Sequence, residues 1–390
     1  MRLSTRMERL GTESAFEVLA RARALEAQGR TITHLEIGEP DFATPAHVVE
    51  AAVRALEAGH THYVPAPGIP ELREAVAEFL ERTGRMATSP DRVVVTPGAK
   101  PVLWYVLHAV CEEGDEVLVP DPSFPIYASL ASFVGATPVP VPLREEHRFR
   151  LDPAELASLV SDRTKLLIVS SPENPCGSAL TREDVEAIAS IAMEHDLLVL
   201  SDEIYWAIRY DGREHASVLD VDGMLDRTVL LDGWSKTFAM TGWRLGFGVF
   251  PTWLVEPVTR LVINSVSCTP AFGQHAAIAA LRGPWDPVEA MVAEFARRRD
   301  VIVDGLNAID GISCVRPGGA FYVFPNIRAL GASSHEVERH LLDDAGVAVL
   351  SGTGFGAYGE GYLRLSYAAS VERIRGAIEA IGASVGALVR

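Results

Sequence analysis

Residues 197–205 read Leu-Leu-Val-Leu-Ser-Asp-Glu-Ile-Tyr, an apolar run that ends in two adjacent acidic residues. A second run of this kind, Leu166-Leu167-Ile168-Val169, lies earlier in the chain. Neither run alternates between apolar and polar residues, so both faces of each expected strand must be covered. Strands that are apolar on both faces are typical of a parallel sheet with helices on each side. The two runs therefore predict a layered α/β fold.

Stretches with helical periodicity separate further runs of this type. The stretch at residues 181–195 opens with Thr181 and carries Asp184 three residues later, which is the pattern of a helix-capping box. Alternating strands and helices predict a mostly parallel, doubly wound sheet. Its strands are expected at residues 92–96, 116–120, 137–141, 165–170, 197–201, 228–232 and 244–250.

The pattern changes after a long expected helix at residues 287–309. Expected strands then lie at residues 312–316, 321–327, 347–351 and 362–367, with helices at 333–345 and 370–389. They indicate a smaller α+β domain, with which an N-terminal helix at residues 14–28 is expected to pack. We therefore expect a large domain at residues 47–286 and a small domain made of residues 1–46 and 287–390. Two domains suit a chain of 390 residues.

The composition is that of an acidic chain, with a formal net charge of −17. Such a surface repels nucleic acid and anionic lipid, so neither is expected as a partner. The four cysteines are far apart and lack metal-ligand spacing, which predicts free thiols in a reducing compartment and no metal site. No secretory signal or membrane-spanning run is evident, so a cytoplasmic enzyme is expected.

One segment combines a lysine and an arginine with aromatic and glycine neighbours. It reads Asp232-Gly-Trp-Ser-Lys236-Thr-Phe-Ala-Met-Thr-Gly-Trp-Arg244-Leu-Gly-Phe-Gly248 and includes the end of an expected strand. A desolvated lysine beside another cation loses its proton and becomes a nucleophile toward aldehydes. The planar guanidinium of Arg244 suits a phosphate group. A solvated lysine after a strand is the plain alternative, which the aromatic neighbours disfavour.

Asp202 follows the apolar run at residues 197–201, where a carboxylate needs a positive partner. A protonated pyridine nitrogen is such a partner, and an aspartate there keeps the ring acting as an electron sink. Tyr205 is close enough in sequence to reach a phenolic oxygen on the same ring. Capping a helix is the alternative role for Asp202. Glu203 is interpreted as structural.

Three further loops after expected strands carry candidate binding residues. Gly98-Ala99-Lys100 joins a strand to a helix, where unpaired backbone amides bind phosphate. Asn174 lies in a loop stiffened by two X-Pro bonds, one of them a candidate cis bond, although Asn-Pro is also an ordinary turn signal. Phe124 either stacks on a planar heterocycle or belongs to the core.

Arg364 alternates with apolar residues in the expected C-terminal strand, so it shares a face with Tyr362 and Ser366. A half-buried arginine suits a bidentate carboxylate. Both a substrate carboxylate and a structural salt bridge fit this pattern.

In this order the segments resemble the class I and II aminotransferases of fold type I, closest to their bacterial aspartate-aminotransferase-like branch. The resemblance runs nearly from end to end of the chain. Further matching segments are Ile37-Gly38-Glu39-Pro40-Asp41-Phe42, Tyr63 with Pro67-Gly68 and Leu72-Arg73, and Pro317-Gly-Gly-Ala-Phe-Tyr322. The resemblance implies pyridoxal 5'-phosphate (PLP) as cofactor and ping-pong transfer of an amino group between an L-amino acid and a 2-oxo acid.

The resemblance also implies a role for each candidate residue. Lys236 would be the Schiff-base lysine and the base that moves the substrate proton. Asp202 would pair with the pyridine nitrogen, Tyr205 and Asn174 would contact the ring oxygen, and Phe124 would stack on the ring. Implied phosphate ligands are Gly98, Ser235 and Arg244, together with Ala99 and Lys100 through their backbone N–H groups. Implied ligands of the substrate α-carboxylate are Gly38, Asn174 and Arg364. Tyr63 would reach the phosphate of a neighbouring subunit, which implies a homodimer with shared sites.

Three features depart from the usual family pattern. Gly233 stands where many relatives have serine, Cys176 replaces the threonine of Asn-Pro-Thr-Gly, and residues 265–275 lack an arginine typical of dicarboxylate-specific relatives. A PLP-dependent elimination, cyclisation or decarboxylation is the main alternative reaction, because it uses the same cofactor contacts. The acidic charge disfavours a PLP-binding DNA regulator, and the lack of Gly-x-Gly-x-x-Gly after the first strands disfavours a nicotinamide enzyme.

Overall fold

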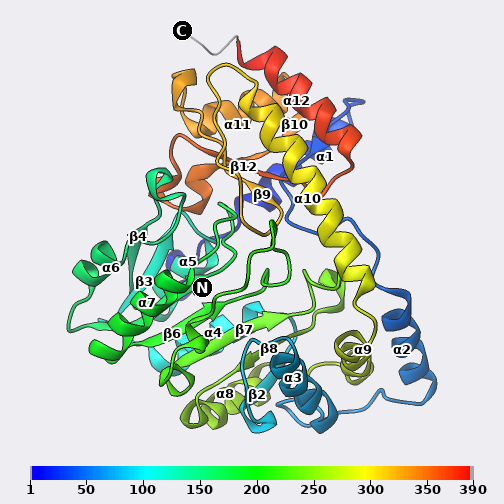
Figure 1. The fold of residues 1–390 in the computed structure, drawn as a ribbon, viewed down its shortest axis with the longest axis vertical. Coiled ribbons are helices and arrows are strands. Elements are labelled where there is room, and N and C mark those ends of the chain that lie inside the picture. Colours follow the sequence, from blue (N-terminus) through cyan, green and yellow to red (C-terminus); the bar gives the residue numbers. More distant parts are fainter. Residues whose placement is uncertain (1, 387–390) are drawn as a thin grey trace.

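A seven-stranded sheet of order β2-β8-β7-β6-β5-β3-β4 forms the centre of the computed structural model, which describes residues 2–386 (Figure 1). Neighbouring strands from β4 to β7 pair in parallel, and β8 is antiparallel to both β7 and β2. The predicted mostly parallel sheet is therefore confirmed. The strands are β2 (Val93–Thr96), β3 (Glu116–Asp121), β4 (Thr137–Pro142), β5 (Thr164–Ser170), β6 (Leu198–Asp202), β7 (Thr228–Gly233) and β8 (Gly246–Val249).

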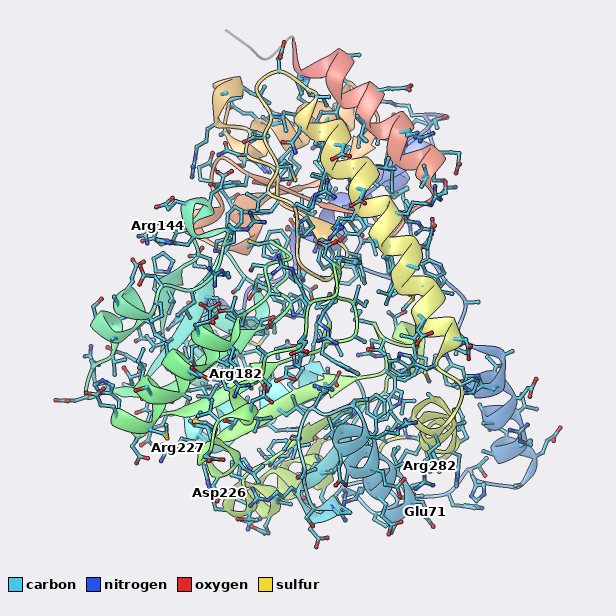
Figure 2. All side chains as sticks on the ribbon, viewed as in Figure 1. Glu71, Arg144, Arg182, Asp226, Arg227 and Arg282 are labelled. Atoms are coloured by element: carbon cyan, nitrogen blue, oxygen red, sulfur yellow. The ribbon has the colours of Figure 1, made fainter. Side chains whose placement is uncertain are left out.

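Both faces of the central strands are buried, as the continuous apolar runs predicted. Leu198 and Leu200 belong to one hydrophobic cluster, whereas Leu197 and Val199 belong to another. Helices cover the sheet from both sides and expose charged residues such as Arg182 (Figure 2). These helices are α2 (Ala46–Glu57), α3 (Pro70–Arg82), α4 (Lys100–Val110), α5 (Ile126–Val134), α6 (Pro153–Leu159), α7 (Arg182–Glu194), α8 (Thr252–Ser265) and α9 (Ala271–Arg282).

The long helix α10 (Asp286–Asn307) leads from the central sheet to a smaller group of elements (Figure 1). There β1 (Thr33–His34) pairs in parallel with β10 (Val347–Ala348), so the two ends of the chain meet. A second small sheet has the order β11-β12-β9. The remaining elements are α1 (Ser14–Glu26), β9 (Tyr322–Val323), α11 (Ser334–Asp343), β11 (Leu350–Ser351), β12 (Leu363–Ser366) and α12 (Val371–Val385). The exact domain boundaries stay predictions.

The small strands differ most from the sequence prediction. The strand expected at residues 312–316 is reduced to a single antiparallel bridge between Ser313 and Asn326. The next residue, Cys314, has its amide and carbonyl bound by the side chain of Asn307. The strand expected at residues 347–351 divides between two sheets, as β10 and β11. The helix expected at residues 370–389 has its last residues outside the described part of the chain. Within residues 2–386, no helix combines the length and the apolar character that crossing a membrane requires.

Candidate active site

A cavity of about 300 Å³ lies at the carboxyl ends of β5, β6 and β7, the edge where ligands bind in parallel α/β sheets. The smaller group of elements closes it from the other side. Predicted site residues that line the cavity are Gly38, Ala99, Lys100, Phe124, Asn174, Asp202, Tyr205, Ser235, Lys236, Arg244 and Arg364. The other two predicted residues, Gly98 and Tyr63, do not line it. Gly98 lies directly beside it, and Tyr63 is 88% exposed.

Lys236 follows β7 through a short loop and donates a hydrogen bond from Nζ to the Gly38 carbonyl at 2.6 Å. Burial lowers the pKa of Lys236 from its ordinary value of 10.5 to about 8; Glu39 opposes this change, and Arg364 and Lys100 add to it. The cations that add to the lowering are therefore Arg364 and Lys100. Arg244, which the sequence analysis assigned to a phosphate, donates to the Thr241 carbonyl.

In the cofactor-free protein, we expect Lys236 to react with an amine-directed reagent half-maximally near pH 8. A lowered lysine pKa leaves the neutral, nucleophilic amine present from about that pH upward. Peptide mapping across a pH series measures this directly, with the exposed Lys165 as the comparison. A half-maximal pH for Lys236 equal to or above that for Lys165 would contradict the expectation.

Asp202 ends β6 and lies fully inside the protein. Its Oδ2 accepts a hydrogen bond from the Tyr127 hydroxyl at 2.6 Å, and its Oδ1 accepts one from the Ile204 amide at 3.1 Å. Burial raises the pKa of Asp202 to about 6, and the Tyr127 hydrogen bond opposes the rise. Sequence reasoning selected Phe124 in this region and missed Tyr127, which lies in the first turn of α5. The Tyr127 amide donates to the Phe124 carbonyl at 3.1 Å, so the two residues lie close together.

Arg364 projects from β12 into the other end of the cavity. Its Nη1 donates to Asn174 Oδ1 at 3.3 Å, and its Nη2 donates to the Glu36 carbonyl. The buried Nε has no partner, and no described residue forms a salt bridge with Arg364. The structural salt bridge that the sequence left open is thus not formed, and the guanidinium suits a ligand carboxylate.

A third group of residues surrounds the N-terminus of α4. Gly98 has a φ of 94°, and a Cβ at this position would clash with the guanidinium of Arg244. Its contribution is therefore to leave room for Arg244. The Lys100 ammonium pairs with Glu13 and lies 5.1 Å from the centre of the Phe124 ring. Helix N-terminal amides beside an arginine form a suitable phosphate site.

Tyr322 is a further cavity residue whose part could not be assigned from sequence. Its hydroxyl forms a 2.7 Å hydrogen bond with that of Tyr205. A Cβ on Gly38 would clash with the same hydroxyl, so glycine lets the two segments approach. The sequence signal that could have pointed to Tyr322 is its position at the end of the Pro317–Tyr322 motif. Glu13 and Phe16 also line the cavity and carried no such signal.

Comparison with known proteins agrees with this geometry. The family profile "Aminotransferase class I and II" matches residues 30–381. The chain is 44% identical to an aspartate aminotransferase of Pyrococcus abyssi over 90% of both chains. It is 43% identical to aromatic-amino-acid aminotransferase 2 of Thermococcus litoralis over 97% of both chains.

The chain belongs to the class I and II aminotransferases. A solved structure of Thermus thermophilus aspartate aminotransferase with maleate aligns with a TM-score of 0.94 at 38% identity, covering 98% of this chain and all of that one. Members of this family depend on PLP, and the chain is accordingly a PLP-dependent transaminase. The alternative PLP reactions are not favoured.

The cavity of this aminotransferase fits PLP in chemistry. The buried carboxylate suits the pyridine nitrogen, and the desolvated amine suits the aldehyde. The helix N-terminus with its adjacent arginine suits the phosphate. The unpartnered Nε of Arg364 is a further sign of a ligand site.

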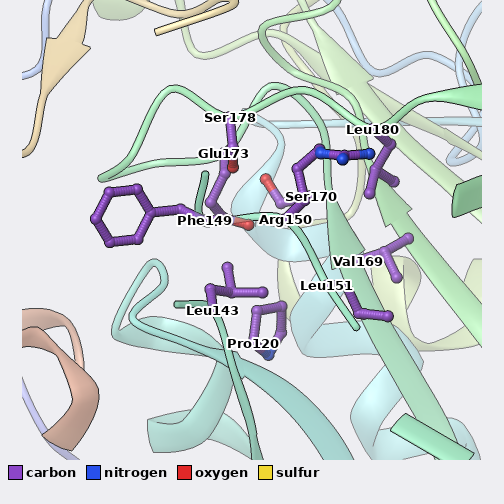
Figure 3. Close-up of a pocket in the computed structure, with 10 residues that line it drawn as sticks. All are labelled: Pro120, Leu143, Phe149, Arg150, Leu151, Val169, Ser170, Glu173, Ser178 and Leu180. Carbon is purple, nitrogen blue, oxygen red and sulfur yellow. The ribbon is translucent and has the colours of Figure 1, made fainter. Parts of the chain in front are cut away.

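The aminotransferase has a second cavity of about 20 Å³, lined by Ser170 at the end of β5 among others (Figure 3). Glu173 lines it with one oxygen buried and unpartnered. Burial, followed by the charge of Asp202, raises the pKa of Glu173 well above its ordinary value. Arg150 also lines this cavity, but its guanidinium pairs with Asp184 at 2.8 Å.

Replacing Glu173 by glutamine should stabilise the cofactor-free protein at neutral pH. A carboxyl group with a raised pKa binds a proton on folding, so its stability contribution is present below about pH 4 and is lost as the pH rises. Glutamine does not titrate, so the gain should grow with pH by at most about 1.4 kcal/mol per unit. Denaturant unfolding at pH 5 and pH 7 measures it. An equal or smaller gain at pH 7 would show that Glu173 is not held protonated.

Proposed function

We propose that Lys236, Asp202 and Arg364 are the principal residues of the transamination reaction. The observation that supports this is their convergence, from three separate segments, on one cavity. Bound PLP supplies an aldehyde carbon that takes up the amino group and a ring that accepts electrons. Lys236 Nζ removes the proton from the substrate Cα, and Arg364 holds the α-carboxylate with help from Asn174 and Gly38. Asp202 keeps a proton on the pyridine nitrogen.

The remaining predicted residues are proposed to hold the cofactor. Tyr205 and Asn174 donate to the ring oxygen, and Phe124 covers one ring face. The phosphate is held at the start of α4 by Gly98, Ala99, Lys100, Ser235 and Arg244.

A homodimer with shared sites is part of the proposal. Tyr63 is 88% exposed and would complete the phosphate site of a second subunit. The apolar residues Val49, Val53 and Leu56 of α2 are exposed, which supports the proposal that a second subunit covers this face. Sedimentation should therefore give twice the mass of the 42.2 kDa chain.

The proposed amino donor is an L-amino acid with an aromatic or other large apolar side chain. Of the positively charged side chains that line the cavity, that of Lys100 has no role in the proposal so far. Its ammonium already pairs with Glu13. A second carboxylate on the substrate would compete with Glu13 for it. Phe16 adds apolar surface to the cavity, and the Thermococcus litoralis relative is named for aromatic amino acids.

A donor screen tests this proposal. The PLP-loaded protein is mixed with phenylalanine, tyrosine, leucine, alanine or aspartate, and pyridoxamine phosphate is measured before any 2-oxo acid is added. We expect its formation to be fastest with the aromatic donors. A faster reaction with aspartate would reject the donor class while leaving transamination in place.

We also propose a cytoplasmic location and the domain division given by the sequence. The four cysteines are unpaired in the structure, which suits a reducing compartment. The pairing of β1 with β10 supports a small domain built from both ends of the chain.

A further inference from the structure

A buried ion cluster lies behind the proposed active-site residues. Arg85 donates from Nη1 to Asp232 at 2.5 Å and from Nη2 to Glu203 at 2.7 Å. All three side chains are 2% exposed. Glu203 directly follows Asp202 in the chain, and Asp232 precedes Lys236 by one short loop.

The cluster lies on the opposite side of the sheet edge from the cavity. Asp202 points toward Tyr127, with which it is hydrogen-bonded. The next residue, Glu203, points the other way, since successive side chains at a strand end alternate. Arg85 meets it there and stacks on Trp206, with its guanidinium carbon 4.4 Å from the ring centre. The cluster therefore does not touch the cofactor or the substrate directly.

Further hydrogen bonds hold the two carboxylates in place. Glu203 accepts from Ser201 at 3.0 Å and from Ser217 at 2.5 Å, and it contacts His215 at 2.6 Å. Asp232 accepts from the amide of Gly233, the last residue of β7, at 2.6 Å. Glu203 is thus bonded to the side chain of a residue next to Asp202, and Asp232 to the backbone of the segment that leads to Lys236.

Two carboxylates on neighbouring buried strands repel each other strongly in a low-dielectric interior. The planar fork of a guanidinium can bind both at once, which a lysine ammonium does less well. Burial raises the pKa of Asp232 to about 6, and Arg85 opposes that rise. The backbone already pairs these strand ends, with the Glu203 amide bonded to the Leu231 carbonyl at 2.9 Å. Arg85 therefore offsets the repulsion between the two carboxylates that meet there.

We propose that Arg85 is a positioning residue that joins the ends of β6 and β7 and thereby fixes the separation of Asp202 from Lys236. The proposal rests on the roles given above to these two residues. A small displacement of reacting groups lowers the rate steeply, by up to ~100-fold for about 1 Å. Substrate binding depends on Arg364 and Asn174, which lie on other segments, so it should change little.

Three variants test this role. Arg85→Met removes the bridge and leaves two buried carboxylates without their cation. The triple variant Arg85→Met, Glu203→Gln, Asp232→Asn removes the bridge and all three charges together. Arg299→Met is the matched control, because Arg299 is also a buried arginine, 3% exposed, that pairs with two aspartates and stacks on a tyrosine outside the cavity.

The measurements are kcat, KM for the amino donor, the dissociation constant of PLP, and the unfolding temperature of the cofactor-free protein. For Arg85→Met we expect kcat to fall by about ten- to a hundredfold, with a KM close to that of the wild type, weaker PLP binding and a lower unfolding temperature. The triple variant should recover most of the unfolding temperature but keep the low kcat and weak PLP binding. Arg299→Met should lose stability and keep kcat.

Two outcomes would overturn the proposal. A folded Arg85→Met variant with wild-type kcat would show that the bridge is dispensable. A triple variant with wild-type kcat and PLP affinity would show that Arg85 only balances charge. If Arg85→Met does not fold, the kcat and the PLP affinity of the triple variant alone test the proposal. Failure of the proposed role of Lys236 is detected separately, by a Lys236→Ala variant in which Arg85 is intact.

Discussion

Replacing Lys236 by alanine should abolish nearly all transamination while leaving the fold intact. The variant loses the desolvated amine that is proposed to move the Cα proton, and acid–base groups of this kind contribute about 10²–10⁴-fold to rates. We expect at least a ~10³-fold fall in kcat. The unfolding curve of the cofactor-free variant should match or exceed that of the wild type, because burying an amine at this site is unfavourable.

Borohydride reduction of the PLP-loaded protein is the decisive measurement. The chain contains three lysines, Lys100, Lys165 and Lys236, so a labelled peptide identifies its site without ambiguity. The label should appear on Lys236 in the wild type and in a Lys165→Ala control. A label on Lys100 or Lys165, or normal turnover by Lys236→Ala, would refute the assignment.

The Asp202→Asn variant should have the second largest effect. Asparagine fits the same space but carries no charge, so it cannot hold a proton on the pyridine nitrogen. Loss of such an electrostatic contact costs on the order of 10²–10³-fold in kcat. The rate of pyridoxamine phosphate formation in a single turnover is the measurement, since it reports the proton-transfer step without the return reaction.

Tyr127→Phe is the matched control for Asp202→Asn. It removes the 2.6 Å hydrogen bond to Asp202 but retains the carboxylate. Its loss should be well below that of Asp202→Asn. Equal losses in the two variants would mean that the hydrogen bond, and not the charge at position 202, determines the rate.

The central sheet could be predicted because its signal is local. Leu197 to Leu200 fill two different clusters, so every residue of the run must be apolar. The capping box of α7 is equally local, with Thr181 and Asp184 bonded to each other as expected. In the smaller group of elements, the strands have only two to four residues. Such short strands show too little apolar alternation for their bounds to be predicted.

Most candidate site residues could be found because they follow strands whose ends meet at one edge. Arg85 could not, since its partners Glu203 and Asp232 lie 118 and 147 positions away. Glu203 was interpreted as structural from its sequence context, which its buried ion pair supports. The Asn307–Cys314 contact was similarly hidden, because a side chain took the place of a strand partner.

Because β1 pairs with β10, Thr33 and His34 gain their strand partners only after residue 348 has left the ribosome. Domains generally fold as units during synthesis, with N-terminal regions first. Gly38 lies just after β1, and Arg364 lies in β12, beyond β10. A nascent chain can therefore complete its central sheet while the carboxylate-binding end of the cavity is still missing. Amino-group transfer should begin only after Arg364 has left the ribosome and β12 has formed.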